Sequence, residues 1–265
     1  MTVRVSVLIG AYQNERTLER AARSILAQTV SDLELLIVDD GSTDGTQQVA
    51  AGICAVDGRA RVLAMGENRG IARSLNAAIE VAAAPLVAIQ DADDWSEPAR
   101  LERQIDVLAD PEIAVVGCRM HEVDRSGREL APRTRWATGD VGSLLMRFNP
   151  VPNTAAMFRR DAVLAIGGYD PRYRWAPEYD LWLRLAERHR VVALAEVLAT
   201  REMSDENVAA RREREQVGET IVMRLRAMRR RRSVRGAGGL VPPVVSYLTP
   251  VSLKRANRRR LGQAP

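Results

Sequence analysis

The sequence predicts an α/β protein in which a mostly parallel sheet is flanked by helices. Short apolar runs alternate with segments whose apolar residues recur every three or four positions, a pattern typical of parallel strands joined by helical crossovers. With 265 residues, 46% of them hydrophobic, the chain is long enough for one substantial core. Several predicted strands end in acidic residues, at the edge of the sheet where such folds bind ligands.

The alternation of strands and helices is clearest over residues 1–117, which we expect to form one α/β half. The predicted strands are 4–12, 33–40, 61–65 and 85–91, and the predicted helices are 15–28, 44–55 and 70–83. Beyond this half the pattern is less regular, although a helix is expected to begin near Pro177. We therefore expect a second half of the same domain at 118–204, followed by a basic helical tail at 205–265.

Cysteine usage and hydropathy limit the compartment. Cys54 and Cys118 lie far apart, with no spacing typical of a disulfide framework or a zinc site, which favours a reducing environment. The N-terminal apolar run 5–10 is too short for a signal peptide, and no stretch approaches the roughly 20 apolar residues that span a bilayer. We expect the protein to stay in the cytoplasm.

Charge is distributed unevenly along the chain. Residues 205–265 contain 15 Lys or Arg against 5 Asp or Glu, whereas residues 1–204 contain 24 against 29. The basic runs at 228–235 and 254–260 are typical of a solvated surface or of attachment to anionic lipid headgroups. Nucleic acid is the partner that we favour least.

The basic tail also carries apolar residues that suit an interface. Val217, Ile221 and Leu225 are spaced by four along a predicted helix, and the apolar stretch 240–253 is too short and too rich in proline to cross a bilayer. These features favour a peripheral location on an anionic membrane surface, and a homodimer formed through the same helix is the alternative.

The segment "LVAIQDADDW" brings a predicted strand out of the core and ends it in three acids. Asp91 and Asp93 are two residues apart in extended chain, so their carboxylates point to the same side. A divalent cation relieves their repulsion most directly, and oxygen ligands favour Mg²⁺ or Mn²⁺ over zinc. The alternative is structural, because Asp94 or Ser96 could cap the helix that follows.

The segment "VDDGSTDGT" at 38–46 follows another predicted strand. Gly41 and Gly45 permit a tight turn, and a turn followed by a helix cap accounts for most of the pattern. It does not require both Asp39 and Asp40, and a carboxylate there could bind a ribose or the imide N–H of a uracil. The chain lacks GxGxxG and GxxxxGK[ST], which argues against a dinucleotide fold and a P-loop.

The chain resembles the family 2 glycosyltransferases, inverting enzymes of the GT-A fold, over about residues 3–202. The resemblance lies in "VSVLIGAYQNERTLERAARSILAQTVSDLELLIVDDGSTDGT", "NRGIARSLNAAI", "DADDW" and "EYDLWLRLAER", in that order. Each motif is loose alone, but the ordered set is specific. The resemblance implies transfer of a sugar from a nucleotide diphosphate donor, a UDP-sugar foremost, to a hydroxyl of a cell-surface glycan or lipid-linked precursor, with Mg²⁺ or Mn²⁺ as cofactor.

The resemblance also assigns roles by position. The residues that would line the nucleotide pocket are Ala11, Tyr12, Glu15 and Asp40. Asp91 would meet the ribose or the metal, and Asp93 would be the principal metal ligand. Arg73 is a further candidate for the nucleotide, and its alternative role is that of an exposed helical arginine.

With residues 1–117 as the nucleotide-sugar-binding half, the second half, residues 118–204, should bind the acceptor and supply the catalytic base. On the helix that begins near Pro177, Glu178 shares a face with apolar residues at spacings of three, four and seven, and the helix dipole helps to keep its carboxylate ionised. Asp180 lies four residues before Arg184, a spacing that predicts a surface ion pair. Glu178 is therefore the expected catalytic residue, with Asp180 in reserve.

Two departures from the family leave alternatives open. Relatives usually have Glu-Asp where this chain has Pro177-Glu178, which lengthens the carboxylate by one methylene. Many relatives have Arg-x-His where Met203 stands, and a thioether is a poor ligand for a hard cation. A sugar-nucleotide binding module without turnover is thus one alternative function. A nucleotidyltransferase is another, although the chain lacks a glycine-rich, basic triphosphate loop.

Overall fold

One nine-stranded sheet runs through the computed structural model, which describes residues 3–132, 135–203, 213–231 and 237–249. Its strands are β1 (Val5–Ala11), β2 (Leu33–Asp39), β3 (Ala60–Ala64), β4 (Leu86–Asp91), β5 (Trp95–Ser96), β6 (Ile113–Val123), β7 (Gly139–Asp140), β8 (Met157–Arg159) and β9 (Arg190–Glu202). The order is β3-β2-β1-β4-β8-β6-β9-β5, and β7 pairs with β9. The neighbours among β1 to β4 are parallel, as are β6 and β9, while β8 enters antiparallel between β4 and β6. The α/β class with a mostly parallel sheet is confirmed.

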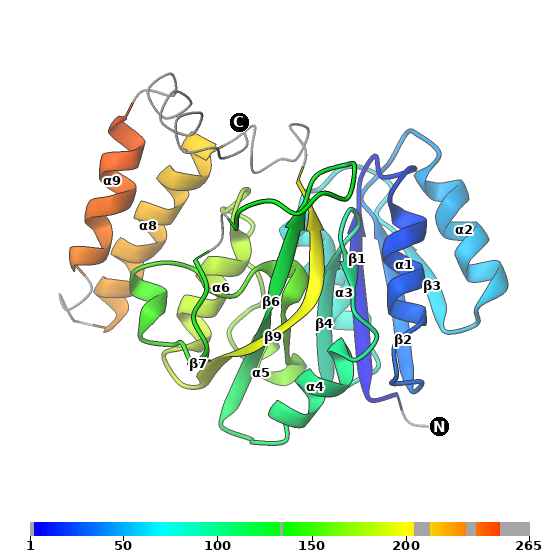
Figure 1. Cartoon of the computed structure of the whole chain (residues 1–265), viewed down its shortest axis with the longest axis horizontal. Coiled ribbons are helices and arrows are strands. Elements are labelled where there is room, and N and C mark those ends of the chain that lie inside the picture. Colours follow the sequence, from blue (N-terminus) through cyan, green and yellow to red (C-terminus); the bar gives the residue numbers. More distant parts are fainter. Residues whose placement is uncertain (1–2, 133–134, 204–212, 232–236, 250–265) are drawn as a thin grey trace.

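Helices cover both faces of this sheet (Figure 1). They are α1 (Leu18–Leu26), α2 (Thr46–Val56), α3 (Ile71–Val81), α4 (Arg100–Val107), α5 (Arg160–Ala165), α6 (Pro177–Leu185), α8 (Glu213–Arg231) and α9 (Val241–Leu248), with 3-10 turns at Leu144–Met146, Asn153–Ala155 and Ala237–Leu240. Successive side chains of a strand point to opposite faces, so Val7 and Ile9 pack with α1, α2 and α4 while Leu8 packs with α3, α5 and α6. The four strands and three helices predicted for the first half are all present.

The helix α8 is part of the same apolar core as α6. Met223 and Ala227 of α8 are fully buried in the same apolar cluster as Trp182 of α6. Figure 1 shows α8 and α9 side by side at the end of the molecule opposite α2. Leu225, which the sequence placed on an apolar side suited to an interface, is 49% exposed. Within the described ranges, no helix is long and apolar enough to cross a membrane.

The strand ends that carry the acidic motifs lie side by side. In the parallel registers Gly10 pairs with Asp91 and Ala11 pairs with Asp39, so β1, β2 and β4 all end at one edge of the sheet. The alternative helix-cap role of the DADD segment is wrong. Helix α4 begins at Arg100 with Ala99 at its N-cap and without a side-chain cap. Asp94 instead accepts the backbone N–H of Glu202 at 3.2 Å, and the hydroxyl of Ser96 donates to the side chain of Gln90.

Candidate functional site

Asp91 ends β4 at the centre of the site. Its backbone N–H donates to the hydroxyl of Thr154 at 2.9 Å, and its carboxylate accepts a hydrogen bond from the side chain of Asn153. Burial raises the pKa of Asp91, and the negative charge of Asp93 raises it further. The carboxylates of Asp91 and Asp93 thus lie close together, as their spacing in the sequence predicted, and their negative charges repel each other.

Arg201, near the end of β9, partly balances these acids. Its Nε lies 3.7 Å from the carboxylate of Asp94, a residue that is only 1% exposed. Burial opposes its positive charge, yet the carboxylates of Asp94 and Asp91 keep the pKa of Arg201 above its ordinary value. The sequence analysis did not single out Arg201. The signal that marks it is the family's Arg-x-His pattern, of which this chain keeps the arginine at Arg201 and replaces the histidine with Met203.

Glu178 faces the same site from the first turn of α6. Its Oε1 accepts a hydrogen bond from the side-chain amide of Asn149 at 3.2 Å. Burial raises the pKa of Glu178 to about 7, its own backbone N–H acts in the opposite direction, and the charge of Asp91 raises it further. Tyr169 is raised in pKa by burial and by both Glu178 and Asp91, so these carboxylates share one environment. A group with this pKa can accept a proton near neutral pH.

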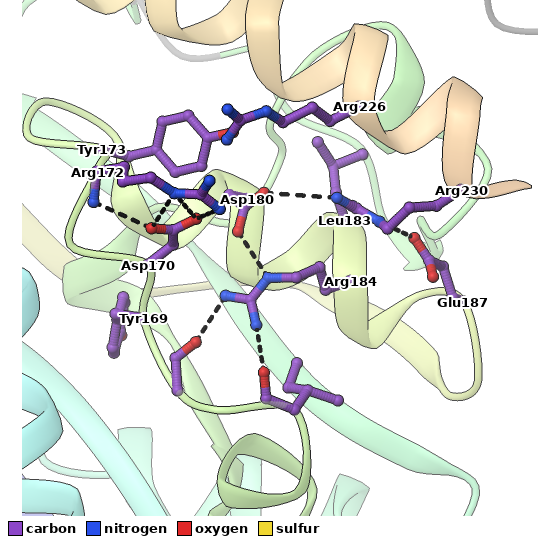
Figure 2. Close-up of polar contacts among 12 residues, drawn as sticks. Tyr169, Asp170, Arg172, Tyr173, Asp180, Leu183, Arg184, Glu187, Arg226 and Arg230 are labelled. Atoms are coloured by element: carbon purple, nitrogen blue, oxygen red, sulfur yellow. Dashed lines mark hydrogen bonds and ion pairs between the residues drawn. The ribbon is translucent and has the colours of Figure 1, made fainter.

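Asp180 forms the predicted ion pair with Arg184, but the carboxylate is buried rather than at the surface. Only 2% of its side chain is exposed, and it accepts a hydrogen bond from Nε of Arg184 at 2.6 Å. The guanidinium of Arg184 also donates hydrogen bonds to the backbone carbonyls of Ile166 and Gly168. Arg230 of α8 lies 4.0 Å from the other carboxylate oxygen of Asp180 (Figure 2). This network satisfies Asp180 internally.

The loops after β1 and β2 are linked by hydrogen bonds. The amide oxygen of Gln13, a residue with φ of 60°, accepts the backbone N–H groups of Thr43 and Asp44. Glu15 accepts the N–H of Gly45 at 2.9 Å. Gln13 was missed by the sequence analysis, since a glutamine in a loop carries no signal of its own. These contacts hold two of the three strand-end loops in one arrangement.

The proposed nucleotide residues differ in how free their side chains are. Asp40 is buried and accepts hydrogen bonds from the N–H groups of Arg69 and Gly70 and from the hydroxyl of Ser74, so its carboxylate anchors the start of α3. Ala11 is buried at the end of β1, whereas the Tyr12 ring is 48% exposed. The structure therefore leaves Tyr12 available for contact with a ligand and commits Asp40 to the protein.

Arg73 lines a pocket of about 310 Å³ at the start of α3. The other lining residues include Arg69, Tyr173 and Arg174, so the pocket is rich in positive charge. Arg73 also donates to the carbonyl of Arg69 at 3.5 Å. The guanidinium of Arg73 thus lies at a basic pocket, where an anionic group would be bound favourably.

Two carboxylates, Asp91 and Asp93, are the donor set available for a divalent cation. The described part of the chain holds no cluster of three or more His, Cys, Asp and Glu suited to a metal. Mg²⁺ and Mn²⁺ are commonly held by one or two carboxylates together with substrate phosphates and water, so the pair fits such an ion. Met203, the half-buried residue that follows β9, offers a thioether and no hard oxygen or nitrogen ligand.

Residues 6–167 match the family described as glycosyl transferase family 2. The amylovoran biosynthesis glycosyltransferase AmsE of Erwinia amylovora is 30% identical over 197 residues, which cover 73% of this chain and 74% of that protein.

Two solved structures share the fold at low identity. The mannosyltransferase PcManGT of Pyrobaculum calidifontis, in complex with GDP-Man and Mn²⁺, superposes with a TM-score of 0.68 at 19% identity, covering 98% of this chain and 79% of that one. The S. aureus TarS fragment 1–349 in complex with UDP-GlcNAc gives 0.67 at 17% identity, covering 83% and 66%. The GT-A type of fold expected from the sequence is confirmed.

Proposed function

Because this chain belongs to glycosyl transferase family 2, we propose that it transfers a sugar from a nucleotide diphosphate donor, a UDP-sugar foremost, to an acceptor hydroxyl with inversion. The observation that carries the proposal is the position of Glu178. Its carboxylate shares a half-buried environment with Asp91. The proposed metal ligand at the end of β4 and the proposed base on α6 thus face one site.

Asp93 and Asp91 are the proposed ligands of Mn²⁺ or Mg²⁺. The bound cation would neutralise negative charge that develops on the diphosphate leaving group. The chain contributes two carboxylates fixed at the end of β4, backed by Arg201 and by the hydrogen bond from Asn153. PcManGT, which was solved with Mn²⁺ and a nucleotide-sugar, supports this choice of cofactor.

Glu178 is the proposed general base. As the acceptor oxygen attacks the anomeric carbon, the carboxylate takes the hydroxyl proton, and attack opposite to the departing diphosphate inverts the configuration. A pKa of about 7 keeps a sizeable fraction of Glu178 ionised at neutral pH while leaving it basic enough to receive the proton. Asp180 is a weaker candidate for this role, because Arg184 and Arg230 already occupy its oxygens.

The nucleotide contacts proposed from the family are consistent with this geometry. Tyr12 presents an exposed ring to a base, and Arg73 presents its positive charge to a phosphate. Ala11, Glu15 and Asp40 shape the pocket through the backbone and the loops that they hold. The identity of UDP rather than another nucleotide rests on the family resemblance and on the neighbour TarS, which was solved with UDP-GlcNAc.

We propose a cell-surface glycan or a lipid-linked precursor as the acceptor and an anionic membrane surface as a partner. AmsE, by its name an amylovoran biosynthesis enzyme, supports a polysaccharide acceptor. Helix α9 exposes Val241, Val245 and Leu248 by 61%, 57% and 73%, and basic runs lie nearby in the sequence. An apolar surface flanked by arginines suits binding at a bilayer interface.

A panel of nucleotide-sugars incubated with Mn²⁺ tests the proposed function directly. Water can replace the acceptor slowly, so release of nucleoside diphosphate from one donor, abolished by EDTA, is the expected result. Binding of the donor without any release would favour the alternative of a binding module, for which Met203 in place of a histidine is the supporting observation. The anomeric configuration of the product, read by NMR, tests inversion.

A further inference from the structure

The carboxylate of Glu219 on α8 holds the chain that leads into α6. Its Oε1 accepts the backbone N–H of Arg174 at 2.8 Å, and its Oε2 accepts those of Trp175 and Ala176 at 2.9 and 3.3 Å. Ala176 is the N-cap of α6 and provides no side-chain cap, and α6 begins at the next residue. One side chain from a remote helix therefore fixes the three residues that precede the Glu178 turn.

Helix α8 is itself firmly placed against α6. Arg224 donates from Nε to the hydroxyl of Tyr179 at 2.8 Å and also bonds the carbonyl of Gly239. Arg230 pairs with Glu187 at 2.6 Å, and Figure 2 shows Arg226 reaching Tyr173 and Arg230 lying beside Asp180 and Glu187. Several arginines that the sequence placed in a solvated tail thus join α8 to the acceptor half.

Burial is the main cause of the raised pKa of Glu178, and the charge of Glu219 adds a smaller part to that rise. The charged groups that influence Glu178 come from three elements: Asp91 on β4, Arg201 on β9 and Glu219 on α8. Asp91 and Glu219 disfavour ionisation of Glu178, whereas Arg201 favours it. Asn149 supplies a neutral hydrogen bond to the carboxylate. Substitution of Glu219 therefore changes both the placement of the base and the charge around it.

We propose that Glu219 is a positioning residue for the reaction, which fixes the segment leading to Glu178 and sets the charge environment in which that carboxylate works. The inference rests on the proposed function of Glu178 as base. It makes α8 part of the catalytic unit, because the contact crosses from residue 219 to residues 174–176.

Three variants test this role. Glu219→Gln removes the charge and one acceptor oxygen, and Glu219→Ala removes the whole contact. Glu187→Gln is the matched control, because it weakens an ion pair between α8 and the turn after α6 without touching residues 174–176. In Glu219→Ala, kcat per folded enzyme should fall about tenfold to a hundredfold with donor KM within about twofold, as expected for a misplaced base. Glu219→Gln should move the acidic limb of the pH–kcat profile to lower pH, and Glu187→Gln should do neither.

A purely structural role would give a different pattern. If Glu219→Ala lowered the melting temperature while kcat of the folded fraction and the acidic limb matched the wild type, the proposal would be overturned. A wild type with no turnover would instead refute the proposed function. NMR titration of ¹³C-glutamate-labelled protein, assigned with Glu178→Gln, then still decides the inference: Glu219→Gln must lower the pKa of Glu178, and an unchanged titration contradicts it.

Discussion

The carboxylate of Asp180 and the guanidinium of Arg184 form an ion pair at 2.6 Å, and only 2% of the aspartate side chain is exposed. Asp180 lies two residues after Glu178 on α6, but its carboxylate contacts a different part of the molecule. The remaining hydrogen bonds of Arg184 reach the carbonyls of Ile166 and Gly168, so the pair joins α6 to the loop after α5. The contacts of Asp180 are therefore those of a residue that stabilises the fold rather than of a catalytic base.

Asp180→Asn should destabilise the fold while sparing the chemistry. It removes the charge of a buried carboxylate and leaves Arg184, 16% exposed, without this counter-charge, and we expect a loss of about 3 kcal/mol in the free energy of unfolding, measured by urea denaturation. The control is Asp170→Asn, whose partner Arg172 is 70% exposed, with an expected loss below about 1 kcal/mol. A hundredfold loss of turnover in folded Asp180→Asn would instead make Asp180 the base.

Asp93→Ala should remove metal-dependent donor binding and leave the fold intact. The substitution relieves repulsion with Asp91, so the stability of the metal-free protein should not fall. Calorimetry with the nucleoside diphosphate measures affinity with Mn²⁺ and with EDTA. The Mn²⁺-dependent part should vanish in the variant while the EDTA value stays unchanged, and retention of the full Mn²⁺ effect would refute the metal assignment.

The raised pKa of Glu178 predicts a pH-dependent stability. The folded protein holds this proton up to about pH 7, whereas the unfolded chain releases it near 4.5, so the contribution of Glu178 to stability is lost as pH rises through this window. Glu178→Gln lacks this loss. At pH 8 the metal-free variant should be about 1–3 kcal/mol more stable than the wild type, and the difference should disappear near pH 4.5. Equal stability at both pH values in urea denaturation would show that Glu178 has an ordinary pKa.

Membrane attachment is best tested on α9 rather than by truncation of the tail. Removing everything after Asn207 would delete α8, and with it the buried Met223 and Ala227. The double substitution Val245→Glu and Leu248→Glu keeps α8 and should abolish co-sedimentation with anionic vesicles, which in the wild type should weaken with salt. Equal partition of the wild type into neutral vesicles, or none at low salt, would favour dimerisation through this surface.

The first half of the fold and the acidic strand end could be predicted because their signals are local. Apolar periodicity specifies the strands and helices of residues 1–117, and the i, i+2 spacing of Asp91 and Asp93 follows from strand geometry. The roles of Arg201 and Glu219 could not be predicted this way, because both approach Glu178 from β9 and α8. The i, i+4 spacing of Asp180 and Arg184 predicted their pairing, but their burial depends on contacts with α5 and α8.

Turnover of Glu178→Gln tests the central claim most directly. The amide nearly preserves the shape of the side chain and its contact with Asn149, so Mn²⁺-dependent nucleotide affinity should be unchanged. Release of nucleoside diphosphate per folded enzyme, measured at pH 8 on the donor that the wild type uses, should fall about a hundredfold or more as the base is lost. Near-normal release by the variant at the same donor affinity would contradict the account, and the proton would then leave by another group.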